Sequence, residues 1–352
     1  MRSALVLFIA ITAVIAGPMS QPSALVAAGC ATPATTDVGT VDGWIGYLHA
    51  HPDRYGLDVT PLRGEPIRHN ATAPLPTASS IKLVHLAAYT QAVAAGRIRS
   101  DDTVSAGEWE RWYFPLDGGA HIASLKYLGI PSANGVASDP ARRVTFGQLA
   151  DVMIRFSDSA APDLFRERLG DDALRDIMIR YHLGHDVPSL LGLYLAFVDP
   201  GLKTAAQRDH AARRYHDDPA YATQMLVRAT GINVATVSSE STIRATPSSL
   251  TSLMTDIADG SLGPGAGETR RILEYQGTRP DGSTVGFKGG SLPGILTEVF
   301  EYRSAQGRTA VGTLMLHNLP ASDLEHDQYS HQQLLLGALT DDRVARALRC
   351  IV

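Results

Sequence analysis

The order in which β-rich and helical segments follow one another limits the folds open to this chain more than any other feature. A helix is expected at 41–51, and short strands follow at 55–59 and 66–69. From Ser79 the apolar spacing is helical, and further helices are expected at 146–155, 162–169, 173–181, 205–215, 219–228 and 248–259. Strands return at 284–288, 297–302 and 309–317, before a last helix at 329–348.

This order predicts an α/β (α+β) fold with two lobes. The two ends of the chain, about 40–76 and 280–352, combine into a lobe with an antiparallel sheet and flanking terminal helices. The middle, about 77–279, forms an all-helical lobe. A cleft between two such lobes is a common place for an active site.

The first residues predict export. Arg2 precedes an apolar run at 4–16, a Gly-Pro pair ends the run, and small residues follow up to Cys30. This sequence of regions is typical of a secretory signal, and the run is short for a membrane span, although a retained anchor is the alternative. We interpret 1–29 as a signal peptide and 30–352 as one domain, secreted or held in the cell envelope.

The two cysteines, Cys30 and Cys350, leave three interpretations open. The stretch at 25–30 (LVAAGC) is similar to a bacterial lipobox, which would make Cys30 a lipidated residue that attaches the protein to a membrane. A disulfide between the two cysteines is allowed in an exported protein. Two unpaired thiols are the third interpretation.

Ser79 and Lys82 stand at the start of the first helical segment of the middle. Residues three apart on a helix are neighbours on one face. A serine is a weak nucleophile until a base removes its proton, and a desolvated lysine beside a second cation, such as Lys288, can be that base near neutral pH. The helix N-terminus adds N–H groups that suit a developing oxyanion. Alone, the pair also fits a solvated helix start.

Two more short patterns follow in order. Ser157-Asp158-Ser159 lies between two expected helices and also fits a plain N-cap. Lys288-Gly289-Gly290-Ser291 lies at the end of an expected strand and also fits a glycine-rich strand end. With Ser79-Ser80-Ile81-Lys82 they resemble the S-x-x-K, S-D-N and K-T-G motifs of class A β-lactamases and penicillin-binding proteins. Residues 77–95, 146–170 and 283–316 are similar to class A segments, and the resemblance covers most of 40–352.

The resemblance to this serine β-lactamase and penicillin-binding superfamily implies a five-stranded antiparallel sheet and a role for each motif residue. Ser79 would be the nucleophile and Lys82 its base. Ser157 would relay a proton to the leaving group, and Lys288 would stabilise the leaving group and the substrate carboxylate. The N–H groups of Ser79 and Ser291 would form the oxyanion hole, beside Gly290.

Two motif positions depart from the family pattern. Ser159 stands where the family has an asparagine that contacts substrate, and Gly289 stands where it has threonine or serine. A hydroxyl that grips a carboxylate is therefore missing at position 289. Both positions still belong to the expected substrate-binding set.

A closer resemblance concerns one subgroup. Residues 109–121 (WERWYFPLDGGAH) and 188–200 resemble the esterase-like β-lactamase-fold protein of the clavulanate biosynthesis cluster. In this subgroup Asp117 and His121 would shape the pocket, and the alternative is a turn held by Asp117 and the glycines beside it.

Efficient β-lactam turnover is not expected, because the deacylating glutamate of class A enzymes is missing. No glutamate occurs between Glu167 and Glu240, and the stretch at 188–197 is apolar where a polar loop would carry it. His185, Asp186 and Glu240 are the nearest substitutes for that base, and Lys82 could serve both half-reactions.

The sequence therefore predicts a serine hydrolase that acts through a Ser79 acyl-enzyme on a β-lactam, an ester or a peptidoglycan-like acyl substrate. The alternative is a non-catalytic or penicillin-trapping envelope protein that retains the fold, either similar to a D-alanyl peptidase or a ligand-binding protein. We expect no cofactor and a monomer. Glu325, His326, Asp327 and His331 could be mistaken for metal ligands but are interpreted as a helix start with surface histidines. With a net charge of −5, nucleic acid is not an expected partner.

Overall fold

The computed structural model describes residues 30, 33–232, 242–327 and 329–352. These residues form two compact units. The helical unit comprises Ile81–Arg180 and the described part of Gly184–Ile243, and the sheet unit comprises the described residues up to Ser80, Tyr181–Leu183 and Arg244–Val352. The expected signal peptide at 1–29 lies outside the described residues.

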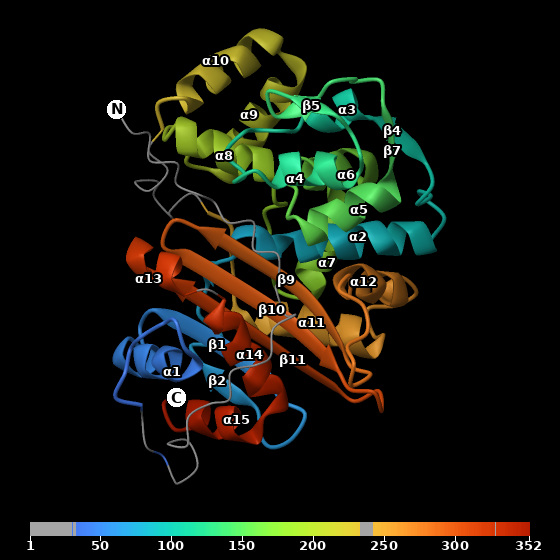
Figure 1. Ribbon diagram of the computed structural model, residues 1–352. Helices are drawn as coiled ribbons and strands as arrows, with labels where there is room; N and C mark the ends of the chain where they lie inside the picture. Colours follow the sequence, from blue (N-terminus) through green and yellow to red (C-terminus); the bar gives the residue numbers. More distant parts are fainter. Residues whose placement is uncertain (1–29, 31–32, 233–241, 328) are drawn as a thin grey trace. The chain divides into compact units, whose positions relative to one another are not determined.

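The sheet unit is built on a five-stranded antiparallel sheet with the strand order β2–β1–β11–β10–β9 (Figure 1). The strands are β1 (Tyr55–Thr60), β2 (Ile67–His69), β9 (Thr284–Leu292), β10 (Ile295–Arg303) and β11 (Thr309–His317). The first and last parts of the chain thus share one sheet, which confirms the predicted fold class. A pair of short strands, β3 (Leu75–Pro76) and β8 (Arg244–Ala245), belongs to the same unit.

Helices cover both faces of this sheet, and adjacent residues of β11 show how. A Cβ on Gly312 would meet Leu335 and Leu339 of α14 at 3.2 Å. The next residue, Thr313, points the other way and its hydroxyl lies 2.8 Å from that of Thr251 in α11. Because both faces are covered, β10 and β11 are buried along most of their length. The helices of this unit are α1 (Val41–Ala50), α11 (Pro247–Asp259), α12 (Ala266–Leu273), α13 (Ala321–His326), α14 (Ser330–Thr340) and α15 (Asp342–Arg349).

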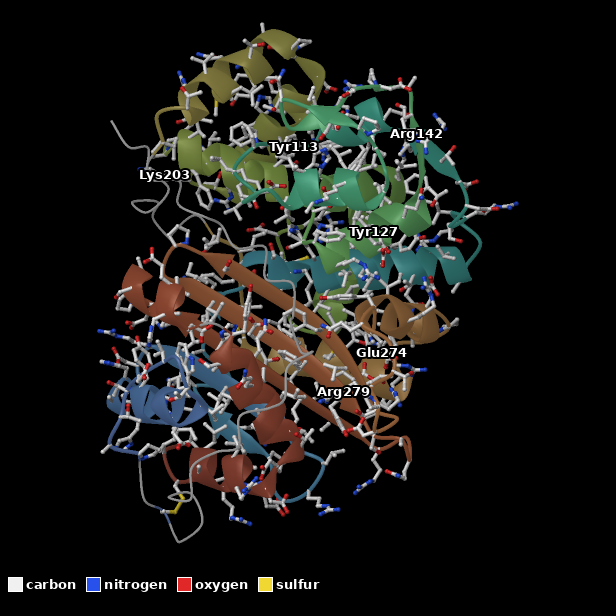
Figure 2. The ribbon with its side chains drawn as sticks, in the orientation of Figure 1. Tyr113, Tyr127, Arg142, Lys203, Glu274 and Arg279 are labelled. Carbon is white, nitrogen blue, oxygen red and sulfur yellow. A yellow bond between two sulfur atoms is a disulfide. The ribbon has the colours of Figure 1, made fainter. Side chains whose placement is uncertain are left out.

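A disulfide joins the two ends of the sheet unit. Cys30 and Cys350 are bonded, with their Cα atoms 5.2 Å apart (Figure 2). Of the three interpretations of these cysteines, the structure therefore agrees with the disulfide. Lipid attachment to Cys30 would use the same sulfur atom and is incompatible with this bridge. In the part of the chain that the structure describes, no helix is long and apolar enough to cross a membrane.

The helical unit contains nine of the described α-helices and two short strand pairs, β4 with β7 and β5 with β6. Its helices are α2 (Lys82–Ala94), α3 (Ala106–Glu110), α4 (Ala120–Tyr127), α5 (Phe146–Arg155), α6 (Ala161–Leu169), α7 (Asp171–Arg180), α8 (Leu190–Val198), α9 (Ala205–Asp217) and α10 (Pro219–Ala229). Its strands are β4 (Thr103–Ser105), β5 (Ser132–Ala133), β6 (Val136–Ala137) and β7 (Arg143–Thr145). Local capping explains several helix starts: Thr145 with Gln148, and Thr204 with Gln207, each form a capping box.

The structure corrects four details of the sequence prediction. The segment from Ser79 begins as a 3-10 turn, η2 (Ala78–Ile81), before α2. The apolar stretch at 188–197 is mostly helix α8. The last helix is two helices, because Asp341 leaves helical geometry and caps α15. Residues 244–279 group with the sheet, whereas the sequence pattern places them in the helical lobe.

Candidate active site

The Ser79 turn lies in the sheet unit, at the start of η2. Ser80 is fully buried, and its hydroxyl donates to the Thr77 carbonyl at 2.7 Å, whereas Ser79 is half-buried. The preceding Ala78 has φ of 43°, in the left-handed region. That conformation costs a residue with a Cβ on the order of 1–2 kcal/mol, and such strain persists only where the surroundings enforce it. The backbone of the Ser79 turn is therefore held in an unusual shape.

Strand β9 passes directly against the Ser79 turn. A Cβ on Gly290 would lie 2.4 Å from the Ser79 nitrogen and 2.8 Å from the Ser80 nitrogen. Any side chain at position 290 would force the two segments apart, so only glycine allows this close approach. The neighbouring strand supports the arrangement, because Thr297 pairs with Gly290 and its hydroxyl donates to the Pro76 carbonyl at 3.0 Å. Ser79 and Gly290 are thus brought together within one unit.

Lys288 and Gly289 occupy opposite faces of β9. Lys288 shares a face with Gly290, since residues two apart in a strand point the same way, and it is buried with its Nζ 2.5 Å from the Gly289 carbonyl oxygen. The motif lies within β9 rather than at its end, because β9 continues to Leu292. At Gly289, a Cβ would lie 2.6 Å from Glu298 Oε2 and 2.7 Å from Phe287 Cζ. A threonine or serine side chain at position 289 would therefore clash with Glu298 and Phe287, which explains why the hydroxyl is missing.

A buried chain of polar groups lies on that second face. His331 Nε2 is 2.7 Å from Glu298 Oε1, and its Nδ1 bonds to Asp327. Trp44 Nε1 donates to Asp327 Oδ1 at 2.6 Å. Burial alone lowers the pKa of His331, but hydrogen bonds and charges from Asp327 and Glu298 outweigh it and raise that pKa to about 9. The prediction of a surface His331 is therefore wrong, because this histidine is buried between two carboxyl groups that favour its charged form.

The Lys82 cluster lies in the helical unit. Lys82 has no exposed surface, and its Nζ donates to the Ser157 carbonyl at 2.5 Å, to Ser157 Oγ at 3.0 Å and to Ser159 Oγ at 3.0 Å. Ser159 Oγ in turn lies 3.1 Å from Tyr194 Oη. Two residues of the second motif thus surround the Lys82 ammonium group. Ser159, which departs from the usual asparagine, is one of them.

The burial of Lys82 suits it to act as a base. Desolvation lowers its pKa to about 8, although the charges of Asp158, Asp117 and Asp163 act in the opposite direction. A lysine with this pKa is neutral in about a tenth of molecules at pH 7. A general base works best when its pKa lies near the working pH.

Ser157 is held in a strained conformation between α5 and α6. Its φ of 64° lies in the left-handed region, which a serine rarely adopts. Two contacts hold it there, since Lys82 binds both its carbonyl and its hydroxyl. The next residue, Asp158, accepts from the backbone N–H groups of Ala160 and Ala161 at 3.0 and 2.7 Å and so fixes the start of α6. The second motif therefore combines a rigid cap with an oriented serine.

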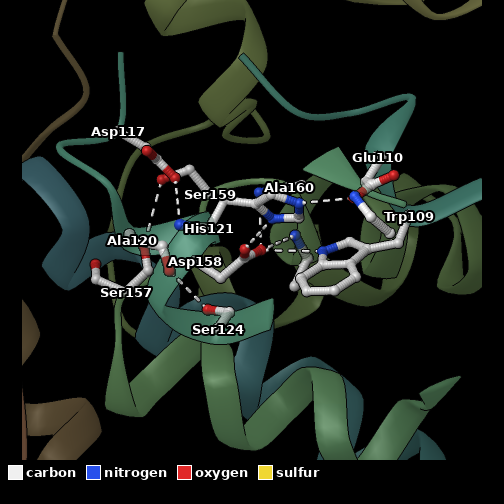
Figure 3. Close-up of polar contacts among 12 residues, drawn as sticks. Trp109, Glu110, Asp117, Ala120, His121, Ser124, Ser157, Asp158, Ser159 and Ala160 are labelled. Carbon is white, nitrogen blue, oxygen red and sulfur yellow. Dashed lines mark hydrogen bonds and ion pairs between the residues drawn. The ribbon is translucent and has the colours of Figure 1, made fainter. Parts of the chain in front are cut away.

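Asp158 also anchors a network toward α4 (Figure 3). Its Oδ2 is 2.7 Å from His121 Nδ1, and its Oδ1 accepts from Trp109 Nε1 at 3.1 Å. Burial lowers the pKa of His121, but the charge and hydrogen bond of Asp158, together with Glu110, raise it to about 9. Asp117 accepts from the N–H groups of Gly119 and His121 at 3.0 and 2.8 Å, which is the turn expected as the alternative. Burial and the charge of Asp158 raise the pKa of Asp117 to about 6.

Tyr194 is the residue of this cluster that the sequence did not single out. It comes from α8, whose first N–H groups at Leu190 and Leu191 donate to Asp163 Oδ2 at 2.9 and 2.8 Å. The sequence signal that could have found this helix is the Ser189 cap at its start. Its apolar side chains are buried throughout, so α8 presents Tyr194 as its polar group to the Lys82 cluster.

The expected site residues thus form two sets. Lys82, Ser157 and Ser159 meet in the helical unit. Ser79 meets Gly290 in the sheet unit, and Lys288, Gly289 and Ser291 lie on the same strand as Gly290. Of the proposed substitutes for the deacylating base, His185 and Asp186 are exposed and do not join the first set, and Glu240 lies outside the described residues. Among the described residues there is no group of His, Cys, Asp and Glu side chains arranged to hold a metal ion.

The sequence model of the beta-lactamase enzyme family matches residues 47–332. The chain belongs to this family. Among curated proteins, none matches the chain in sequence. The closer resemblance to the esterase-like subgroup stays a prediction.

Solved structures of β-lactamases and a penicillin-binding protein share the fold. A β-lactamase from Sphaerobacter thermophilus DSM 20745 has a TM-score of 0.55 at 17% identity, over 84% of this chain and 95% of that chain. PBP-A has a TM-score of 0.53 at 16% identity, over 84% and 95%. A variant of the class A β-lactamase of the last common ancestor of Gram-negative bacteria has a TM-score of 0.54 at 16% identity, over 84% and 97%. At these identities the likeness establishes the class A β-lactamase fold and nothing beyond it.

Proposed function

We propose that this member of the beta-lactamase family is an exported serine hydrolase that acts through an acyl-enzyme on Ser79. The Lys82 cluster carries the proposal. A fully buried lysine that donates to serine hydroxyls and has a pKa lowered to about 8 is suited to proton transfer. Lys82 follows Ser79 by three residues in the S-x-x-K motif, and its neutral form would take the Ser79 proton.

The other motif residues have complementary roles in this reaction. The N–H groups of Ser79 and Ser291 would stabilise the oxyanion. The closeness of Gly290 to the Ser79 nitrogen supports that role, because it brings β9 backbone next to the Ser79 turn. Ser157, bonded to Lys82, would pass a proton to the leaving group, and Lys288 would stabilise the charge that develops there. Gly289 would contact the substrate through its backbone, and Ser159 would contact it through its hydroxyl group.

The substrate is a β-lactam, an ester or a peptidoglycan-like acyl compound. PBP-A, which shares the fold, has a variant solved as an acyl-enzyme complex with penicillin G. That precedent favours a β-lactam as the first probe for this chain. A D-alanyl peptidase activity ranks second, because the same motifs serve both reactions.

The lack of a carboxylate on helix α8 keeps a penicillin-trapping protein as the second candidate. Helix α8 is apolar and buried along its length, and it occupies the sequence region where a class A enzyme would carry the deacylating glutamate. Without a carboxylate there, water would depend on Lys82 for activation. The acyl-enzyme would then persist, and the protein would behave as a trap rather than an efficient β-lactamase.

Export has support from the bridge between Cys30 and Cys350. Disulfides persist mainly in oxidising compartments outside the cytoplasm. This agrees with the signal-like sequence at 1–29 and with a mature protein that acts in the cell envelope or the medium.

The intact mass of the purified protein tests this proposal. The protein is mixed separately with penicillin G, a cephalosporin and a neutral p-nitrophenyl ester, and the Ser79→Ala variant is treated in parallel. We expect a mass increase by one acyl group that is absent from Ser79→Ala, and the rate of its decay separates a hydrolase from a trap. An adduct that forms equally in Ser79→Ala, or no adduct and no consumption of any probe, would refute the proposal.

A further inference from the structure

Thr297 joins the sheet to the segment that leads into Ser79. Its hydroxyl donates to the Pro76 carbonyl at 3.0 Å, and a carbonyl oxygen can only accept, so the direction of this hydrogen bond is fixed. Thr297 has no exposed surface, so water does not compete for the bond. All three residues belong to the sheet unit. Strand β10 is thus tied to a point three residues before Ser79.

The glycine opposite Thr297 leaves room for this contact. Thr297 and Gly290 pair across β10 and β9, so their side-chain positions lie on the same face of the sheet. A Cβ on Gly290 would lie 2.4 Å from the Ser79 nitrogen, so the Ser79 turn occupies the space over Gly290. Gly290 therefore makes room for the turn, and Thr297 supplies a hydrogen bond that holds it there.

The residues after Pro76 carry this restraint on to Ser79. Ser80 donates to the Thr77 carbonyl through its N–H at 3.1 Å and through its hydroxyl at 2.7 Å, which closes a tight turn. Within this turn Ala78 has φ of 43°, and such a conformation persists only where the surroundings enforce it. The bond that fixes Pro76 at the start of the turn is one such restraint.

We propose that Thr297 is a positioning residue that holds the Ser79 turn against β9 and so fixes the Ser79 N–H for the oxyanion. Its effect on rate rests on the proposed acyl-enzyme function, in which the N–H groups of Ser79 and Ser291 stabilise the oxyanion. Such donors act only when they point to the place where the charge develops, and a small displacement of a positioned group costs a large factor in rate. Thr297 acts through the Pro76 backbone and not on the acyl group itself.

Three substitutions separate this role from a general loss of stability. Thr297→Val keeps the shape of the side chain and removes the hydroxyl, whereas Thr297→Ser keeps the hydroxyl. Thr313→Val is the matched control, because Thr313 is also fully buried and its hydroxyl lies 2.8 Å from that of Thr251 in α11. Thr313 pairs with Val299, two residues from Thr297, so it lies on the same face of the same sheet.

Backbone hydrogen exchange of the full protein tests the position of the turn without any substrate. Mass spectrometry follows the amides of residues 77–82, which include the Ser80 N–H that donates to Thr77. We expect exchange about tenfold faster in Thr297→Val than in the wild type, the effect of leaving a buried acceptor unpaired. Thr297→Ser and Thr313→Val should stay within about threefold of the wild type. Wild-type exchange in Thr297→Val, or equal acceleration in Thr313→Val, would overturn the proposal.

Acylation by penicillin G tests the effect on the oxyanion. Adduct formation over a range of penicillin concentrations gives the maximal acylation rate and the concentration that gives half of it. We expect Thr297→Val to lower the maximal rate about tenfold, less than the loss of about a hundredfold or more on removal of an oxyanion donor. The half-saturating concentration should stay within about twofold, because the oxyanion exists only after binding.

The control variants decide what a slower acylation means. Thr297→Ser and Thr313→Val should keep the wild-type acylation rate, because both leave the bond to Pro76 in place. An equal loss of rate in Thr313→Val, or a loss in Thr297→Val confined to the half-saturating concentration, would overturn the positioning role.

A second pair of variants keeps the test decisive if Thr297→Val does not fold. Thr297→Ser and Thr297→Cys have side chains of similar size, and the thiol is the weaker donor. Thr297→Cys should exchange faster at residues 77–82 and acylate more slowly than Thr297→Ser, and equal values would overturn the proposal. A wild type that no probe acylates would refute the proposed function alone, because hydrogen exchange then still decides whether Thr297 holds the Ser79 turn.

Discussion

The buried cluster of His331, Glu298 and Asp327 predicts a specific loss of stability at alkaline pH. His331 is 2% exposed, and its pKa is raised from 6.5 to about 9. One pKa unit corresponds to 1.36 kcal/mol, so the shift is worth about 3 kcal/mol. Because the pKa in the folded protein is above that in the unfolded chain, this stabilisation is complete below pH 6.5. It is lost as the pH rises through 9.

The prediction is tested with His331→Gln, which keeps a hydrogen-bonding side chain but cannot carry the charge. Urea unfolding followed by far-UV circular dichroism is measured from pH 6 to 10 for both proteins. The wild type should be the more stable at pH 6, and the gap should shrink by up to about 3 kcal/mol toward pH 10. His210→Gln, at an exposed histidine, is the control and should follow the wild type. A gap that does not change with pH would refute the buried charge on His331.

Three further predictions follow from the same contacts. Gly289→Ala should lower the free energy of unfolding by about 1–3 kcal/mol, because the new Cβ would meet Glu298 and Phe287. Gly267→Ala, where the new Cβ would meet open space, should leave that free energy unchanged. Equal urea midpoints for the two variants would contradict this prediction. Replacing Cys30 and Cys350 together by serine should cost about 2–5 kcal/mol in urea unfolding, and the wild type should show no reactive thiol before reduction. A reactive thiol in the unreduced protein would count against the bridge. The acylation rate should rise about tenfold between pH 7 and 9, because the pKa of Lys82 is about 8; stopped-flow measurements that show a flat profile would exclude Lys82 as the base.

Sequence reasoning succeeded where a local pattern carries the information. The antiparallel sheet built from both ends of the chain follows from the order of β-rich and helical segments, and each expected strand is present within a few residues. Lys82, Ser157 and Ser159 were selected from the motifs, and they lie in contact in the structure, while their catalytic roles stay predictions. These features depend on periodicity and short spacing, which are visible in one sequence.

The rest depends on contacts between distant residues. Helix α8 was missed because nearly every residue at 190–198 is apolar, so neither a helical nor a strand period can be recognised. His331 was placed on the surface because its partner Glu298 lies 33 residues away in a strand. Gly289 was interpreted as a lost hydroxyl, because no local signal shows that Glu298 and Phe287 fill the space of its side chain.

The most direct test of the central claim is to locate the acyl group on the chain. After reaction with penicillin G, the protein is cleaved with trypsin, which releases residues 69–82, a peptide with two serines, Ser79 and Ser80. Ser80 is fully buried and bonded to Thr77. We predict that tandem mass spectrometry places the acyl group on Ser79 and that Lys82→Ala, at pH 7, forms the adduct far more slowly. An acyl group on any other residue would contradict the account.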